Sequence, residues 1–186
     1  MMRGCVGEAL VSHCGGYRWT LSRTWDGRPH LLVCMFNPST ADAMQDDPTI
    51  RLLCQVAAHN GYGGFTVVNA VPLRSPTPGD AAHMVNTWDK RQAWDERDRL
   101  QHNLGVIERE VRGARGVLLA WGALGMLCPD WIDRVLEAIH EALPDGVPLL
   151  CLGTTKHGYP KHPMARGAHK VRPDAPLVPW VRGGGA

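Results

Sequence analysis

The most constraining feature of the chain is an uninterrupted apolar run, LLVCMF at residues 31–36, which stops at Asn37-Pro38-Ser39-Thr40. A run without a polar face is typical of a central strand whose two faces are both covered by helices. Proline cannot continue such a strand, so the strand ends there. In open α/β sheets, ligands bind beyond the carboxyl ends of the strands. The polar segment after the run is therefore the first candidate for a functional site.

Apolar strands alternate with helices along the rest of the chain. We predict strands at residues 63–71, 116–121 and 147–153, and helices at residues 48–60, 86–112 and 130–143. Strands that alternate with helices indicate a mainly parallel sheet in an α/β fold with three layers, α/β/α.

The segment before the central strand predicts an N-terminal β-hairpin. Residues 17–25 alternate large and polar side chains, which is the period of a half-buried strand. The Asp26-Gly27 pair is a strong turn signal, and residues 28–36 form the returning strand. We expect this hairpin to lead the chain into the centre of the sheet.

Length and composition limit the remaining possibilities. A chain of 186 residues predicts a single domain over residues 1–186, with residues 1–15 and 174–186 loosely ordered. No apolar run approaches the roughly 20 residues of a membrane span, and no secretory signal is visible, so we expect a cytoplasmic monomer without membrane contact. The six cysteines include no C-x-x-C pair, and we expect neither a metal nor another cofactor.

Charge and motifs narrow the function further. The net charge is only +2, but the segment after residue 155 is basic and carries the side chains Lys156, Lys161, Arg166, Lys170, Arg172 and Arg182 against one acid, Asp174. Such a segment can bind phosphate or be a solvated tail. The glycine-rich dinucleotide and P-loop motifs and the G-x-S-x-G elbow are all absent, which disfavours those enzyme classes.

Polar residues follow three of the predicted strands. They are Asn37, Asn69 and His162. Asn37 can be part of a simple turn, and His162-Pro163 can be a surface turn. Asn69 lies inside a strand, where burial of an unpaired amide costs roughly 1–3 kcal/mol, so it needs a loop backbone or a ligand as partner. Their joint occurrence at strand ends predicts that the three side chains converge on one pocket.

The motifs around these residues resemble two known families. The strand followed by Asn37-Pro38 resembles the first motif of the uracil-DNA glycosylase superfamily, in its mismatch-specific and single-strand-selective branches. VVNAVPLRSPTP resembles the second core strand of that superfamily, and LLCLGTTKHGYPKHPMARG resembles its closing strand and His-Pro loop. More closely, YRWTLSRTW, FNPSTAD, DDPTIR, VVNAVPLR, LLAWG and PKHP together resemble a bacterial and phage family catalogued as domain of unknown function 1643.

The glycosylase resemblance implies a uracil-DNA-glycosylase-like fold and a protein that binds DNA, flips out a damaged or modified base and hydrolyses its N-glycosidic bond. Asn37 and His162 would be catalytic, Asn37 by holding water and His162 by donating to the departing base. The residues implied in binding the base are Phe36, Pro38, Ser39, Tyr62 and Asn69. Those implied in contacting DNA are Lys156, His157, Lys161, Met164 and Arg166.

The chain departs from this superfamily in two places. The most active members carry an aspartate where this chain has Asn37, so water activation would be weaker. Asp42 or Asp47 either supplies the missing carboxylate, or pairs with Arg51 to fix the loop, or serves only in solvent-exposed positions and helix capping. The branches with an iron–sulfur cluster have a cysteine just beyond the second-motif asparagine, where this chain has Pro72 and Leu73, so no cluster is expected.

Two other functions remain open from the sequence. One is a non-catalytic protein that binds nucleic acid, a nucleotide or a small nucleobase in a glycosylase-like pocket. The other is an enzyme of DNA base modification or defence that performs a different reaction at the base.

Overall fold

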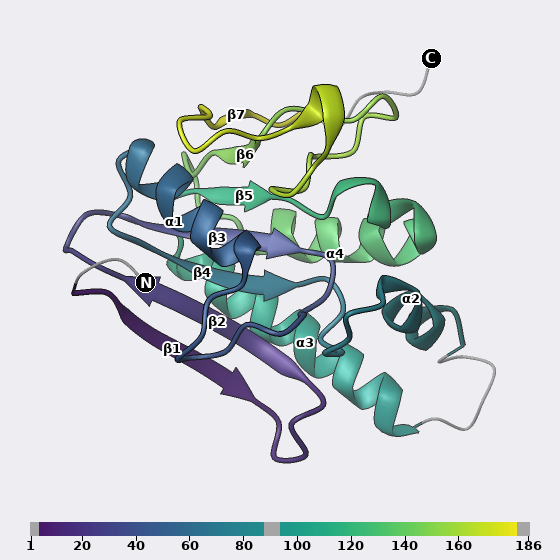
Figure 1. Ribbon diagram of the computed structural model, residues 1–186. Coiled ribbons are helices and arrows are strands. Elements are labelled where there is room, and N and C mark those ends of the chain that lie inside the picture. The colour runs from purple at the N-terminus through teal and green to yellow at the C-terminus, as the bar shows by residue number, and fades with distance from the viewer. Residues whose placement is uncertain (1–3, 88–93, 182–186) are drawn as a thin grey trace.

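A seven-stranded sheet organises the chain, in a computed structural model that describes residues 4–87 and 94–181 (Figure 1). Its strand order is β1-β2-β4-β3-β5-β6-β7. The strands are β1 (Val6–Val11), β2 (Arg18–Thr24), β3 (His30–Met35), β4 (Gly64–Asn69), β5 (Val117–Leu119), β6 (Leu149–Cys151) and β7 (Val178–Pro179).

The sheet is mixed, so the prediction of a mainly parallel sheet is wrong. The four central strands β4, β3, β5 and β6 run parallel to one another, as the alternation of strands and helices indicated. Antiparallel pairs flank this centre, because β2 pairs with β4, β1 with β2, and β7 with β6. The sequence reasoning assigned no strand to either end of the chain and therefore missed β1 and β7.

The predicted hairpin is also wrong in its pairing. Both predicted strands form, as β2 and β3, but β4 lies between them. The connection at residues 25–29 passes around the start of β4, where Gly63 donates to Pro29 O and accepts from the backbone N–H of Trp25 and Asp26. An N-terminal hairpin does exist, but its strands are β1 and β2. The apolar β3 is thus reserved for the sheet centre, where both of its faces are buried.

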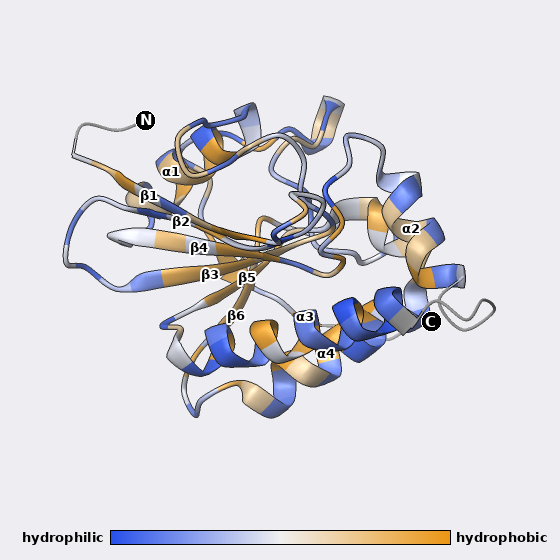
Figure 2. Cartoon of the chain, turned by 90° about the horizontal axis from the view of Figure 1, so that it is seen from below, coloured by the Kyte–Doolittle hydropathy of each residue, from blue (hydrophilic) through white to orange (hydrophobic). Residues whose placement is uncertain are grey.

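Helices pack on both faces of this sheet. The α-helices are α1 (Pro48–His59), α2 (Pro78–Thr87), α3 (Trp94–Gly113) and α4 (Pro129–Ala142), and the short 3-10 helices are η1 (Gly122–Leu127) and η2 (Gly167–His169). Figure 2 shows α1 on one face and α3 and α4 on the other, with their apolar sides toward the sheet. In Figure 1, α2 lies beyond the ends toward which the parallel strands point.

The helix boundaries partly follow the sequence signals. Asp47 caps α1 by accepting from Ile50 N at 2.9 Å, and proline occupies the first helical position. The predicted helix at residues 86–112 is replaced by α2 and α3, with residues 88–93 outside the described part. Pro78 begins α2, a position where its missing N–H costs nothing.

Both ends of the described part of the chain are bonded to the rest of the fold. β1 pairs with β2 over its full length. Near the other end, the Asn60 side chain donates to Ala175 O and accepts from Leu177 N, each at 2.9 Å. This amide therefore ties the C-terminal segment to the end of α1.

Among the residues that the structure describes, no helix is both long enough and apolar enough to cross a bilayer. The apolar side chains instead divide into two clusters, one on each face of the sheet. One cluster includes side chains of α1, and the other includes side chains of α2, α3 and α4. The strands β3 and β4 contribute to both, which places them at the centre of the hydrophobic core.

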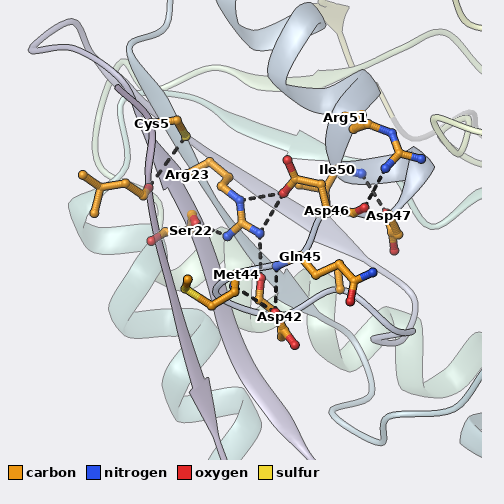
Figure 3. A network of polar contacts seen from close by, with 12 residues as sticks. Cys5, Ser22, Arg23, Asp42, Met44, Gln45, Asp46, Asp47, Ile50 and Arg51 are labelled. Atoms are coloured by element: carbon orange, nitrogen blue, oxygen red, sulfur yellow. Dashed lines mark hydrogen bonds and ion pairs between the residues drawn. The ribbon is translucent and has the colours of Figure 1, made fainter. Parts of the chain in front are cut away.

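The loop between β3 and α1 is attached to β2 by a buried arginine (Figure 3). Arg23 is fully buried, and its Nε donates to Asp46 Oδ1 at 2.8 Å. Its Nη2 donates to Asp42 O at 2.6 Å, and its Nη1 donates to Ser22 O at 2.8 Å. The side chain of Asp46 is only 4% exposed, so this ion pair is shielded from solvent.

Removal of the Asp46 carboxylate tests how strongly the fold depends on this ion pair. We expect Asp46→Ala to lower the free energy of unfolding by about 3–5 kcal/mol, because the Arg23 charge stays buried without its partner. Chemical denaturation measures the change. The control is Arg28→Ala, which removes the exposed ion pair with Asp26 and should alter stability little. Equal losses in the two variants would contradict the role given to Arg23.

Candidate functional site

A cavity of about 490 Å³ opens at the carboxyl ends of β3 and β4. Its volume lies within the range that small-molecule sites occupy. Its walls come from the ends of β2, β3 and β4, the start of α1, the loop before α2, η1 and the loop after β6. The lining residues are Arg18, Met35, Phe36, Asn37, Ser39, Thr40, Asp47, Pro48, Thr49, Ile50, Asn69, Ser75, Pro76, Pro78, Leu124, His162, Met164 and Arg166.

The three polar residues that follow the predicted strands do line this one cavity. Asn37 enters it after β3, Asn69 from the last position of β4, and His162 from the loop after β6. Residues 37 and 162 are far apart in the chain and meet because parallel strands end at the same edge of the sheet. Of the other residues implied in binding the base or DNA, Phe36, Ser39, Met164 and Arg166 also line it. Their roles stay predictions.

Asn69 is the most deeply buried polar group of the cavity. Its side chain is 1% exposed, and its Oδ1 accepts from Arg18 Nη2 at 3.3 Å. Its Nδ2 has no hydrogen-bond partner among the described residues. The backbone around it is fixed from behind, since Asn103 Nδ2 donates to Asn69 O at 2.8 Å and Trp131 Nε1 donates to Ala70 O at 2.9 Å. The amide is thus held in place with one donor unused.

Arg18 lies beside Asn69 and was not predicted as a site residue. The side chain is 4% exposed, and Nη1 donates to Ala41 O at 2.7 Å. Burial lowers the pKa of its guanidinium to about 10, and the nearby Asp47 carboxylate partly offsets that shift. The guanidinium therefore stays charged at neutral pH while most of its surroundings are uncharged.

The sequence offered little to identify Arg18. Arg18 and Arg23 both belong to β2, where large and polar residues alternate and so predict a strand with only one buried face. Arginines in such a strand are expected on the exposed face. Both are buried, because the loop from Asn37 to Asp47 covers them. This loop is distant from β2 in the sequence, so neither the composition nor the alternation of residues in β2 could show that it buries the two arginines.

Asn37 acts as a clamp between two loops. Its Nδ2 donates to Pro38 O at 3.0 Å and to Ser75 O at 2.9 Å, and it is 3.4 Å from Leu73 O. Ser75 N in turn donates to Pro38 O at 3.0 Å. The amide nitrogen is therefore engaged by the protein, and the Oδ1 is the atom with which Asn37 can bind a water or a ligand.

His162 is held in one tautomer by a backbone contact. Its Nδ1 accepts from Met164 N at 3.0 Å, so in the neutral ring the proton resides on Nε2. Burial lowers the pKa of His162 below its usual 6.5, partly opposed by the Asp47 carboxylate. At neutral pH the ring is therefore uncharged and offers an Nε2–H donor.

A glycine lets the chain after β5 approach His162. Gly122 has φ +68°, and a Cβ built on it would lie 2.9 Å from His162 Cβ. Its N–H donates to Pro160 O at 2.9 Å, which joins the start of η1 to the loop that carries the histidine. The position of the ring thus depends on the absence of a side chain at residue 122.

Asp47 is the carboxylate of the cavity. Its Oδ1 is used as the cap of α1, and the same side chain acts electrostatically on both Arg18 and His162. Asp42 does not line the cavity; its Oδ1 accepts from the N–H of Met44 and Gln45 at 2.8 Å. Of the two acids that the sequence singled out, only Asp47 is placed to meet a ligand.

Tyr62 and Pro38 do not line the cavity, and Tyr62 lies at the wrong end of the sheet for its implied role. Its hydroxyl approaches Gly116, which precedes β5, whereas the cavity lies beyond the carboxyl ends of the strands. The reason is that Tyr62 follows α1 and precedes β4, on the side from which the parallel strands start. Pro38 is buried and contributes only its carbonyl, as acceptor of the Asn37 and Ser75 bonds.

The basic residues of the loop after β6 lie beside the cavity. Lys156 and His157 are exposed at the tip of a turn closed by the Thr154–Pro160 bridge. His157 lines a neighbouring cavity of about 210 Å³, together with Trp121 and Trp180. Lys161 is half-buried, and its backbone N–H donates to Gly153 O at 2.9 Å. None of these three side chains lines the main cavity.

The arrangement combines donors at the bottom of the cavity with an acid near its wall. Arg18, Asn69 and His162 all present N–H groups, while Asp47 and Asn37 present oxygen acceptors. Such a set can bind a planar ring with carbonyl oxygens and can polarise a water molecule beside it. In the described ranges, no group of three or more His, Cys, Asp or Glu side chains is placed to hold a metal ion.

The chain belongs to the family whose model is described as Protein of unknown function (DUF1643), which matches residues 18–164. That span contains every cavity residue discussed above except Arg166. No curated protein and no solved structure matches the chain. The resemblance to the uracil-DNA glycosylase superfamily therefore rests on the sequence motifs alone.

Enlargement of Gly122 should displace His162. We expect Gly122→Ala to lower the free energy of unfolding by more than the roughly 1–2 kcal/mol that a left-handed conformation costs an alanine, because the new methyl group also meets His162. The control is Gly146→Ala, where φ is +76° and the added Cβ has no atom within 4 Å. Equal losses in thermal denaturation, with an unchanged His162 ring signal in the NMR spectrum, would contradict this account.

His162 should titrate below pH 6.5 in the folded protein. Because the unfolded chain then binds a proton more readily than the folded chain, this residue makes the fold less stable as the pH falls below about 6.5 and contributes no loss above it. Two-dimensional NMR of the imidazole ring measures the pKa and the tautomer. A midpoint above 6.5, or a proton on Nδ1 at neutral pH, would contradict the assigned state.

Proposed function

We propose that this member of the DUF1643 family is a DNA glycosylase-like hydrolase, which binds a flipped damaged or modified base and cleaves its N-glycosidic bond. The observation that carries the proposal is the convergence of Asn37, Asn69 and His162 on one cavity at the strand ends. The order of these residues along the chain is the order that the glycosylase motifs imply. The lone carboxylate Asp47 lies in the same cavity.

The base would be read mainly by Asn69. One amide offers a donor and an acceptor to the edge of a ring, but here Oδ1 is engaged by Arg18 and the unused atom is the donor Nδ2. The site therefore favours a base that presents a carbonyl oxygen or an unprotonated ring nitrogen to this position. Phe36 is 1% exposed and contributes an apolar wall.

The hydrolysis would use the groups on either side of the sugar–base bond. The bond between C1′ and the base nitrogen breaks, and its electron pair stays on the base. Water adds to C1′ and passes its proton to Asp47, with Asn37 Oδ1 as a further acceptor that orients it. The Nε2–H of His162 donates a hydrogen bond to the departing base. Asp47 thereby takes the task that the missing first-motif aspartate performs in the resembling superfamily.

DNA would approach across the loop after β6. Lys156 and His157 are exposed there, and Arg166 and Met164 lie at the cavity rim with exposed side chains. Cations on this side can contact the phosphates that flank the flipped nucleotide, and the Met164 side chain, 44% exposed, can occupy the gap in the stack.

A second candidate is a protein that binds a base or nucleotide without turnover. The observation that favours it is the Asn37 amide nitrogen, which is engaged by backbone carbonyls and leaves only one atom for water. This candidate predicts base-dependent binding that Asn69→Ala weakens and no release of product.

Release of free base from oligonucleotides tests the proposal. Oligonucleotides that contain uracil, hydroxymethyluracil or a mismatched base are incubated with the protein, and released bases are quantified by chromatography. We expect release from at least one of them. Asp47→Asn should slow release by about 10²–10⁴-fold, the usual contribution of a general base, while an asparagine still caps α1.

The control for the Asp47→Asn result is Asp145→Asn, in the loop before β6 and outside the cavity. It should release base at the wild-type rate. No release from any oligonucleotide, or equal rates for Asp47→Asn and the wild type, would overturn the glycosylase mechanism. Binding that persists without release would favour the second candidate.

A further inference from the structure

Strand β2 carries two buried arginines that differ in how their charge is balanced. Arg23 is 0% exposed and Arg18 is 4% exposed. Both donate to backbone carbonyls of the same loop, Arg23 to Asp42 O and Arg18 to Ala41 O. A guanidinium has five N–H donors and keeps its charge at neutral pH, so each side chain needs acceptors and a negative charge.

The charge of Arg23 is balanced within the protein. Asp46 Oδ1 lies 2.8 Å from both Nε and Nη2, and two carbonyls accept the remaining bonds. This side chain does not line the cavity. Arg23 is thus a structural residue whose donors and charge are used.

The charge of Arg18 is not balanced in the same way. Its hydrogen bonds go to a carbonyl and to the Asn69 amide oxygen, both neutral, and its Nε has no partner among the described residues. Within that part of the chain no carboxylate lies within ion-pair distance of it. Asp47 and Asp42 act on it from farther away, and Arg74 and Arg23 act against them.

A buried charge without a counter-charge is costly, and proteins keep such groups where a ligand completes them. Arg18 lines the cavity, and its neighbour Asn69 has an unused donor in the same place. Two sets of donors with one positive charge therefore converge at the bottom of the cavity. An uncharged ring that presents an N–H donor to Arg18 and Asn69 would leave the N–H groups of both side chains without an acceptor.

We propose that Arg18 is the charge-neutralising residue of the ligand site, and that the cavity takes a nucleobase in its anionic form, with a ring carbonyl oxygen that shares the negative charge directed toward Arg18 and Asn69. The inference deepens the proposed function and rests on it for the reaction step. When the glycosidic bond breaks, the electron pair makes the departing base an anion. Arg18 balances that charge, and the base takes up a proton from solvent after release.

The inference predicts that acidic bases bind more tightly than weakly acidic ones. The probes are thymine, 5-chlorouracil and 5-nitrouracil as free bases, which share one ring and increase in acidity in that order through their 5-substituents. Isothermal titration calorimetry at one pH and one salt concentration measures the dissociation constants. We expect the wild type to bind 5-nitrouracil, the most acidic of the three, about tenfold to a hundredfold more tightly than thymine.

Substitution of Arg18 should remove this preference. Arg18→Gln keeps hydrogen-bonding atoms and loses the charge, so the three bases should bind with similar affinity. Arg18→Lys keeps the charge and should retain the order of affinities at lower strength. The matched control is Arg28→Lys, which keeps the charge of an exposed arginine outside the cavity and should leave the order of affinities unchanged.

Several results would overturn the inference. They are wild-type affinities that do not rise with acidity, absence of measurable binding of all three bases to the wild type, and an Arg18→Gln variant that keeps the preference. The wild-type measurement alone decides the matter if Arg18→Gln does not fold. Base release from oligonucleotides is recorded separately. A preference for anionic bases without release supports the role proposed for Arg18 and refutes the glycosylase activity. Release without the preference supports the glycosylase activity and refutes the role proposed for Arg18.

Discussion

The loop between β3 and α1 is held by two buried arginines of one strand, and the cavity depends on that attachment. Arg18 and Arg23 reach from β2 to carbonyls of adjacent residues, Ala41 and Asp42. Backbone carbonyls in a covered loop need donors, and the guanidinium groups supply them. The loop in turn delivers Asn37 at one end and Asp47 at the other, so both cavity walls are positioned by the same two side chains.

The cavity forms where independent parts of the fold end together. The parallel strands bring Asn37 and Asn69 to one edge, and the loop after β6 adds His162 from the other side of β5. Small residues permit these approaches, since Gly122 leaves room for the histidine. Asn103 and Trp131 fix the backbone at the end of β4, so that the helices behind the sheet support the residue that faces the ligand.

The elements of the fold followed from local patterns, and their pairing did not. The Asp47 cap, the apolar β3 and the amphipathic α4 are each visible within a few residues of sequence. The pairing partner of β2 could not be read from the local sequence, because a strand with one polar face can pair on either side. In the structure β4 inserts between β2 and β3. The same limit explains β1 and β7, which are strands because a neighbour offers an edge.

The sequence by itself determined that polar residues follow the central strands, and strand direction then requires that Asn37 and Asn69 meet. It also determined the α1 cap, since capping is a local interaction. Only the tertiary structure decided that Asn37 is a clamp, that Tyr62 lies at the opposite end, and that Asp47 rather than Asp42 enters the cavity. Arg18 became a candidate only when its loop covered it, because burial and an unbalanced charge are properties of surroundings assembled from distant segments.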